Sequence, residues 1–193
     1  TSVAGMYRFN TSGYDFQILA GKYLDDMAIG AGWAGSLGNI GFKGEATYFK
    51  PLQRNGVGPQ VFVATTTLDY SFANSLYING AYLFSSNGIN RSINLEGDVN
   101  LLSSIGVLTP KSLFPTQSAA FLTLAYPISP LWNISLAGMY GFGMNLGFIS
   151  PNISYSIKDN LDVILIGQSF YLEQKGKMES LGNGVNFRLK WSF

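Results

Sequence analysis

The last ten residues, Gly184-Val-Asn-Phe-Arg-Leu-Lys-Trp-Ser-Phe193, alternate between apolar and polar side chains. Successive side chains of an extended chain point to opposite faces, so this alternation separates the two kinds. The apolar face is Val185, Phe187, Leu189, Trp191 and Phe193, and the polar face is Asn186, Arg188, Lys190 and Ser192. A period of two predicts a β-strand with one apolar and one wet face. Such a strand fits a soluble sandwich, whose apolar face packs on a second sheet, or a transmembrane barrel, whose apolar face meets lipid.

The composition excludes several classes of function. The 193 residues include no histidine and no cysteine, so Ser-His-Asp and Cys-His catalysis, disulfides and the usual zinc sites are ruled out. Lys and Arg number 12 against 11 Asp and Glu, which gives no basic face for nucleic acid. We therefore expect a protein that is not an enzyme, that holds no metal or cofactor, and that does not bind nucleic acid.

Charged residues make up 12% of the chain, about half the share of a typical soluble domain, and aromatic residues make up 15%. None of the residues between Lys111 and Lys158 is charged, which raises the possibility of a membrane helix. Proline and glycine interrupt this stretch, however, and polar residues recur at every second position within it. A helix does not have that period, so the stretch is predicted to form strands.

Four segments share one pattern of a strand, a tight polar turn and a second strand, with tyrosine on the strand that enters the turn. They are Tyr7–Phe16, Tyr70–Ile78, Tyr126–Ile134 and Tyr155–Val163. Repeated hairpins of this kind indicate an up-and-down barrel. Extending them predicts eleven strands near 2–9, 14–23, 27–36, 40–50, 60–72, 76–86, 118–128, 132–142, 147–158, 161–173 and 184–193. The short turns near 10–13, 37–39, 73–75, 129–131 and 159–160 are assigned to the periplasmic side, and the connections near 24–26, 51–59, 87–117, 143–146 and 174–183 to the outside.

The terminal segment 184–193 resembles the C-terminal strand of Gram-negative outer-membrane β-barrel proteins, which ends in Phe after alternating apolar residues. Through its hairpins and its last residue, the whole chain also resembles the C-terminal half of long porin-like proteins. The resemblance implies an all-β, antiparallel up-and-down transmembrane β-barrel over residues 1–193. It also implies the bacterial outer membrane as the location. The implied partners are outer-membrane lipid, lipopolysaccharide and the barrel-assembly machinery that reads the last strand.

The odd strand number has a consequence for closure. The first and the eleventh strand run in the same direction, whereas bacterial single-chain barrels have even strand numbers and an antiparallel seam. Either one strand is missed or invented, or the chain is the C-terminal part of a barrel of twelve or more strands. In the second case an upstream segment or another subunit supplies the rest. We predict that residues 1–193 do not close a barrel by themselves.

The tyrosines fix which residues face the lumen, and nearly every charge on a strand falls on that side. The predicted lumen-lining residues are Arg8, Asp15, Gln17, Lys43, Glu45, Asp69, Asn79, Asn133, Asp162, Gln168, Arg188 and Lys190. They form either a charged ring that tunes the passage of solutes, or cross-strand salt pairs such as Asp162 with Lys190. The predicted membrane-interface aromatics are Tyr70, Tyr126, Tyr155, Trp191 and Phe193.

Three further features bear on function. The G-x-G-x-x-G pattern at Gly30–Gly35 is followed by a turn and a strand rather than a helix, so we interpret it as strand glycines and not a nucleotide site. Asp25 and Asp26 suggest a solvated turn more than a cation site. The long segment 87–117 is apolar enough to fold into the lumen or lie against the rim or a partner. The sequence predicts a porin-like channel for passive diffusion of small polar solutes, or a scaffold barrel with a filled lumen.

Overall fold

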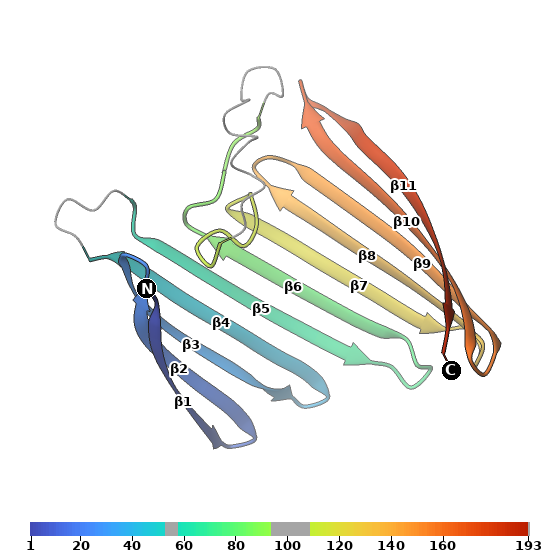
Figure 1. The fold of residues 1–193 in the computed structure, drawn as a ribbon, viewed down its shortest axis with the longest axis horizontal. Helices are drawn as coiled ribbons and strands as arrows, with labels where there is room; N and C mark the ends of the chain where they lie inside the picture. Colours follow the sequence, from blue (N-terminus) through green and yellow to red (C-terminus); the bar gives the residue numbers. More distant parts are fainter. Residues whose placement is uncertain (53–57, 94–108, 193) are drawn as a thin grey trace.

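The computed structural model describes residues 1–52, 58–93 and 109–192. These residues form one sheet of eleven antiparallel strands whose spatial order is the chain order (Figure 1). The strands are β1 (Val3–Thr11), β2 (Tyr14–Tyr23), β3 (Asp26–Leu37), β4 (Ile40–Pro51), β5 (Val61–Ser71), β6 (Tyr77–Ser85), β7 (Ser118–Pro127), β8 (Trp132–Phe142), β9 (Leu146–Lys158), β10 (Leu161–Gln174) and β11 (Lys177–Trp191). The predicted all-β, up-and-down topology and the strand number are confirmed.

We call the two ends of the sheet the turn end and the loop end. The turn end carries the connections 12–13, 38–39, 72–76, 128–131 and 159–160, and the loop end carries 24–25, 52–60, 86–117, 143–145 and 175–176. Within the described ranges, no helix is long and apolar enough to cross a membrane.

The tightest hairpins use backbone conformations that few residues adopt. Ser12 and Gly13 have φ angles of 52° and 79°, and Lys175 and Gly176 have φ angles of 52° and 80°. Two consecutive positive φ angles define the two-residue turn whose twist matches that of the flanking strands. These short turns fix the register of β1 with β2 and of β10 with β11.

The prediction for residues 174–183 was wrong. These residues do not form an outer loop: β10 continues to Gln174, and β11 begins at Lys177 rather than near residue 184. The register shifts where Phe170 pairs with Gly182 and Tyr171 pairs with Ser180, which leaves Leu181 as an extra residue on β11. Such a bulge breaks the alternation of apolar and polar residues, so the pattern in the sequence stops before the strand does.

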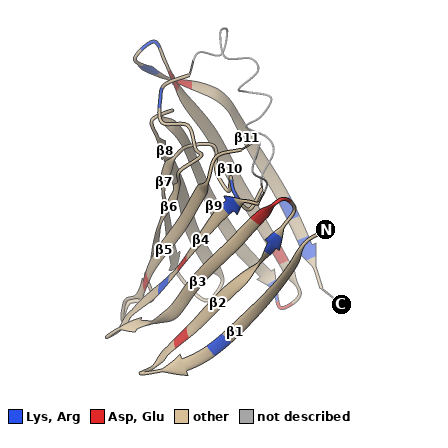
Figure 2. Ribbon diagram, turned by 90° about the vertical axis from the view of Figure 1, so that its left-hand side faces the viewer, with Lys and Arg blue, Asp and Glu red and all other residues tan. Residues whose placement is uncertain are grey.

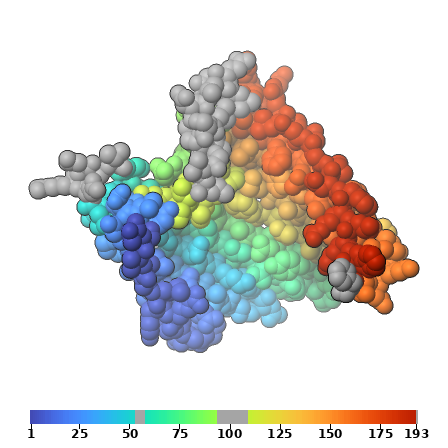
Figure 3. All heavy atoms as spheres, in the orientation of Figure 1, coloured from blue at the N-terminus to red at the C-terminus, as the bar shows by residue number. Residues whose placement is uncertain are grey.

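The sheet is bent into an open trough with β1 and β11 at its two rims (Figures 1 and 2). Figure 3 shows the hollow between the rims. No described residue pairs with the free edge of either rim strand, so the sheet is not closed. Both strands run toward the turn end, as the odd strand number requires. The prediction that these residues do not close a ring by themselves is confirmed.

The two faces of the sheet differ sharply in character. The convex face is apolar and exposed: Val185, Phe187 and Trp191 keep 75%, 67% and 73% of their surface accessible. The register assigns four charged residues of the described strands to this face, and all lie near strand ends: Lys22, Lys50 and Glu173 near the loop end, and Lys158 at the turn end. The other strand charges described below lie on the concave face.

Aromatic rings cover glycines on the convex face. A Cβ atom on Gly44 would lie 2.3 Å from Cζ2 of Trp33 and 2.8 Å from the carbonyl oxygen of Thr65. We expect Gly44→Val to destabilise the protein by about 1–3 kcal/mol, because the neighbouring strand and the indole must move. Gly80→Val, on the same face with nothing within 4 Å of its Cβ position, is the control and should change stability little. Urea unfolding of the two variants tests this, and equal effects would contradict the packing of Trp33 on Gly44.

Candidate functional site on the concave face

Every residue that the sequence assigned to the lumen lies on the concave face. The pairing register places Arg8 opposite Gln17, Asp69 opposite Asn79, and Asp162 opposite Lys190. The same alternation carries the rest of the set to this face: Asp15, Lys43, Glu45, Asn133, Gln168 and Arg188. Figure 2 shows charged bands near the turn end of β1 and β2.

The charges of β1 to β4 surround a groove of about 690 Å³. Gly32 and Ala34 of β3 form its floor, and their small size leaves it open. Arg8 and Asp15 line one wall, and Lys43 and Glu45 line the other. Two cross-strand rows build the groove: Arg8, Gln17, Gly32 and Glu45 in the first, and Asn10, Asp15, Ala34 and Lys43 in the second.

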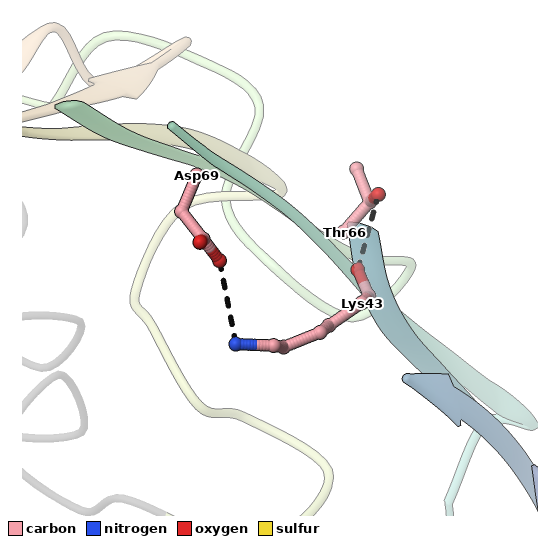
Figure 4. Close-up of polar contacts among 3 residues, drawn as sticks. All are labelled: Lys43, Thr66 and Asp69. Atoms are coloured by element: carbon pink, nitrogen blue, oxygen red, sulfur yellow. Dashed lines mark hydrogen bonds and ion pairs between the residues drawn. The ribbon is translucent and has the colours of Figure 1, made fainter. Parts of the chain in front are cut away.

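One ion pair is formed at the edge of this groove. Nζ of Lys43 lies 3.3 Å from Oδ1 of Asp69 on the neighbouring strand, and the hydroxyl of Thr66 donates to the carbonyl oxygen of Lys43 at 3.5 Å (Figure 4). The Lys43 side chain is 58% exposed and that of Asp69 is 23% exposed. Water screens such a contact, so it contributes at most about 1 kcal/mol to stability.

Most of the remaining strand charges are not paired as the salt-pair interpretation requires. Asp162 and Lys190 face each other in register, but the Asp162 carboxylate accepts a hydrogen bond from the Ser156 hydroxyl at 2.6 Å instead of an ion pair. The ion pairs between described residues are Lys43 with Asp69 and Lys111 with Asp26. Arg8 and Glu45 therefore have no ionic partner among the described residues.

The described parts of the long connection between β6 and β7, residues 86–93 and 109–117, lie on the concave face at the loop end and reach both arms of the trough. On one side Lys111 pairs with Asp26 of β3, and its Nζ lies 5.9 Å from the centre of the Phe49 ring. On the other side Ile93 packs with Met144 and Leu172, both buried. Segment 87–117 was predicted to fold inward or lie at the rim, and these parts fold onto the concave face; residues 94–108 lie outside the described ones.

Sequence reasoning missed the role of Asp26. We interpreted it with Asp25 as a solvated turn, but its residue surface is only 8% exposed and it holds Lys111. Lys111 and Asp26 are far apart in the chain, so no local pattern signals their contact. The role of Gly141 was also missed. A Cβ atom on Gly141 would lie 2.6 Å from Cγ2 of Thr116, so glycine at this position lets the connection between β6 and β7 approach β8.

The predicted aromatics lie on the convex face near the turn end. Tyr70, Tyr126 and Tyr155 belong to β5, β7 and β9, and Tyr155 stacks on Trp132 with ring centres 4.4 Å apart. Trp191 ends β11 on the same face. The prediction for Phe193 lies outside the described residues.

The site has no features of a metal or nucleotide centre in the part of the chain that the structure describes. No group of three or more acidic residues there could hold a metal ion. Gly30–Gly35 lies within β3, and β4 follows it. No protein-family model matches the chain, and no curated protein matches it.

Proposed function

We propose that this chain is a sector of an outer-membrane β-barrel channel through which small polar solutes diffuse passively. The observation that carries the proposal is the separation of the two faces: charged and polar side chains gather on the concave face, and the exposed convex face is apolar. A transmembrane barrel needs this inverted arrangement, since its outside meets lipid and its inside meets water.

The convex face supports contact with outer-membrane lipid and lipopolysaccharide. Leu122, Ile149 and Leu165 are 47%, 40% and 44% exposed along the middle of their strands. In water such a surface would promote aggregation, whereas in a bilayer the lipid tails solvate its apolar side chains. Tyr126 and Trp132 near the turn end suit the interface between hydrocarbon and headgroups. The assembly machinery of the outer membrane would then read the terminal strand.

The free edges of β1 and β11 require further strands in this proposal. In lipid each unpaired backbone group costs several kcal/mol, so an open edge is not tolerated. Antiparallel closure needs an odd number of additional strands, because both rim strands run toward the turn end. We propose that a further segment of the same polypeptide, or another subunit, completes a barrel of twelve or more strands.

The groove favours a channel over a scaffold. Its charged walls are open, and Arg8 and Glu45 in them form no ion pair with a described residue, which is typical of a surface that meets water and solutes. The scaffold alternative, a barrel with a filled lumen, is favoured by the packing of segments 86–93 and 109–117 on the concave face. That packing is confined to the loop end among the described residues. The proposed protein is not an enzyme and uses no cofactor, metal or nucleic acid.

Single-channel recording tests the proposal. The complete protein, purified in mild detergent with any strands that accompany it, is inserted into a planar lipid bilayer. We expect discrete conductance steps that scale with salt concentration, because the lumen is wet. Protein that is inserted and protected from added protease, but that conducts no ions, would contradict the channel and support the scaffold.

A further inference from the structure

Two charges of opposite sign face the groove with no ionic partner among the described residues. Arg8 on β1 and Glu45 on β4 belong to one cross-strand row, separated by Gln17 and by Gly32. Neither forms an ion pair with any described residue. Three strand spacings separate their backbones, about 14 Å along the sheet. The two long side chains shorten this gap but do not close it.

The next row repeats the arrangement with the signs exchanged. Asp15 on β2 and Lys43 on β4 stand on either side of Ala34. Asp15 accepts a hydrogen bond from Nδ2 of Asn10 at 2.9 Å, and Lys43 is held by Asp69. Each wall of the groove therefore carries one positive and one negative group, in opposite order along the strands.

This pattern discriminates between classes of solute. A solute with a single charge is attracted to one group of the row and repelled by the other, so it gains little. A neutral solute gains no charge-assisted hydrogen bond. A solute with a carboxylate and an ammonium group satisfies both walls at once, and its two charges meet groups of opposite sign.

We propose that the groove binds small zwitterionic solutes, with Arg8 receiving the carboxylate and Glu45 the ammonium group. This inference rests on the proposed channel and names the solute class that it prefers. The Arg8 and Glu45 side chains are partly solvated, so the solute binds weakly enough to be released, which a channel requires. Lys43 and Asp15 offer the same pair of charges one row nearer the turn end, and so a second step along the path.

The test compares two isosteric solutes in liposome swelling with the complete protein. Free alanine is a zwitterion, and lactamide has nearly the same size and shape without charges. We expect alanine to enter faster than lactamide by roughly fivefold, the size expected of two solvated charge contacts. The double variant R8Q/E45Q keeps the net charge and should abolish this preference. The exchanged variant R8E/E45R keeps both charges and should restore it.

The matched control is D159N/K175Q, which removes one charge of each sign from turns outside the groove and should keep the preference. Circular dichroism confirms that each variant keeps its sheet. If lactamide enters and alanine is no faster, the zwitterion site is refuted while the channel stands. If neither solute enters, the channel and this inference fail together. Equal preference in R8Q/E45Q and the unaltered protein also overturns the assignment of these two residues.

Discussion

Leu122→Arg is expected to destabilise the protein in a lipid bilayer by about 2–4 kcal/mol, the cost of a cation at the middle of a barrel's lipid face. Leu122 lies midway along β7 on the convex face, where it is 47% exposed and opposite Gly80 and Gly138 in register. No carboxylate of the described strands belongs to that row, so the guanidinium would have no acidic partner there. Urea unfolding from lipid vesicles, followed by tryptophan fluorescence, measures the loss.

Thr123→Arg is the matched control for this substitution. Thr123 is the next residue of the same strand, but it faces the trough, opposite Asn79 and Ala137. A cation there remains in water, so the free energy of unfolding should change by less than about 1 kcal/mol. Equal losses for the two variants would show that the convex face does not lie in lipid. That result would overturn the proposed location, whatever the conductance.

Asp26→Asn is expected to lower the free energy of unfolding by about 3 kcal/mol. The side chains of Asp26 and Lys111 are 12% and 22% exposed, and loss of one partner leaves the other charge uncompensated in a mostly buried site. The Lys111 ammonium also lies near Phe49, and the Ser85 hydroxyl donates to the Lys111 carbonyl oxygen at 3.1 Å. Detachment of segment 109–117 should appear as faster proteolysis next to Lys111.

Asp69→Asn makes the same chemical change in the exposed pair with Lys43 and serves as the comparison. Because the Lys43 side chain is 58% exposed, water replaces the lost contact, and the expected cost is below about 1 kcal/mol. A loss at Asp26 no larger than that at Asp69 would mean that the buried pair does not hold the connection on the sheet. Restoring stability with D26N/K111M, which removes both charges, would support the explanation from an uncompensated charge.

The alternation of apolar and polar residues predicted most of the sheet. The strands near 132–142 and 161–173 match β8 and β10 to within a residue, because a strand exposed to different surroundings on its two faces needs alternating side chains. The same rule placed Arg8, Glu45 and the other predicted lumen residues on one face. It failed at β11, where the bulge at Leu181 interrupts the period.

The sequence by itself therefore determined most of the strands, their faces and the parity that prevents β1 and β11 from pairing with each other as antiparallel strands. These features follow from local periodicity and from counting turns. Only the tertiary structure decided that Lys111 reaches Asp26, that Ile93 packs with Met144 and Leu172, and that Arg8 and Glu45 share one row with a gap between them. The physical reason is that cross-strand register and sheet curvature set such contacts. Both depend on all the intervening turns, and no short stretch of sequence encodes them.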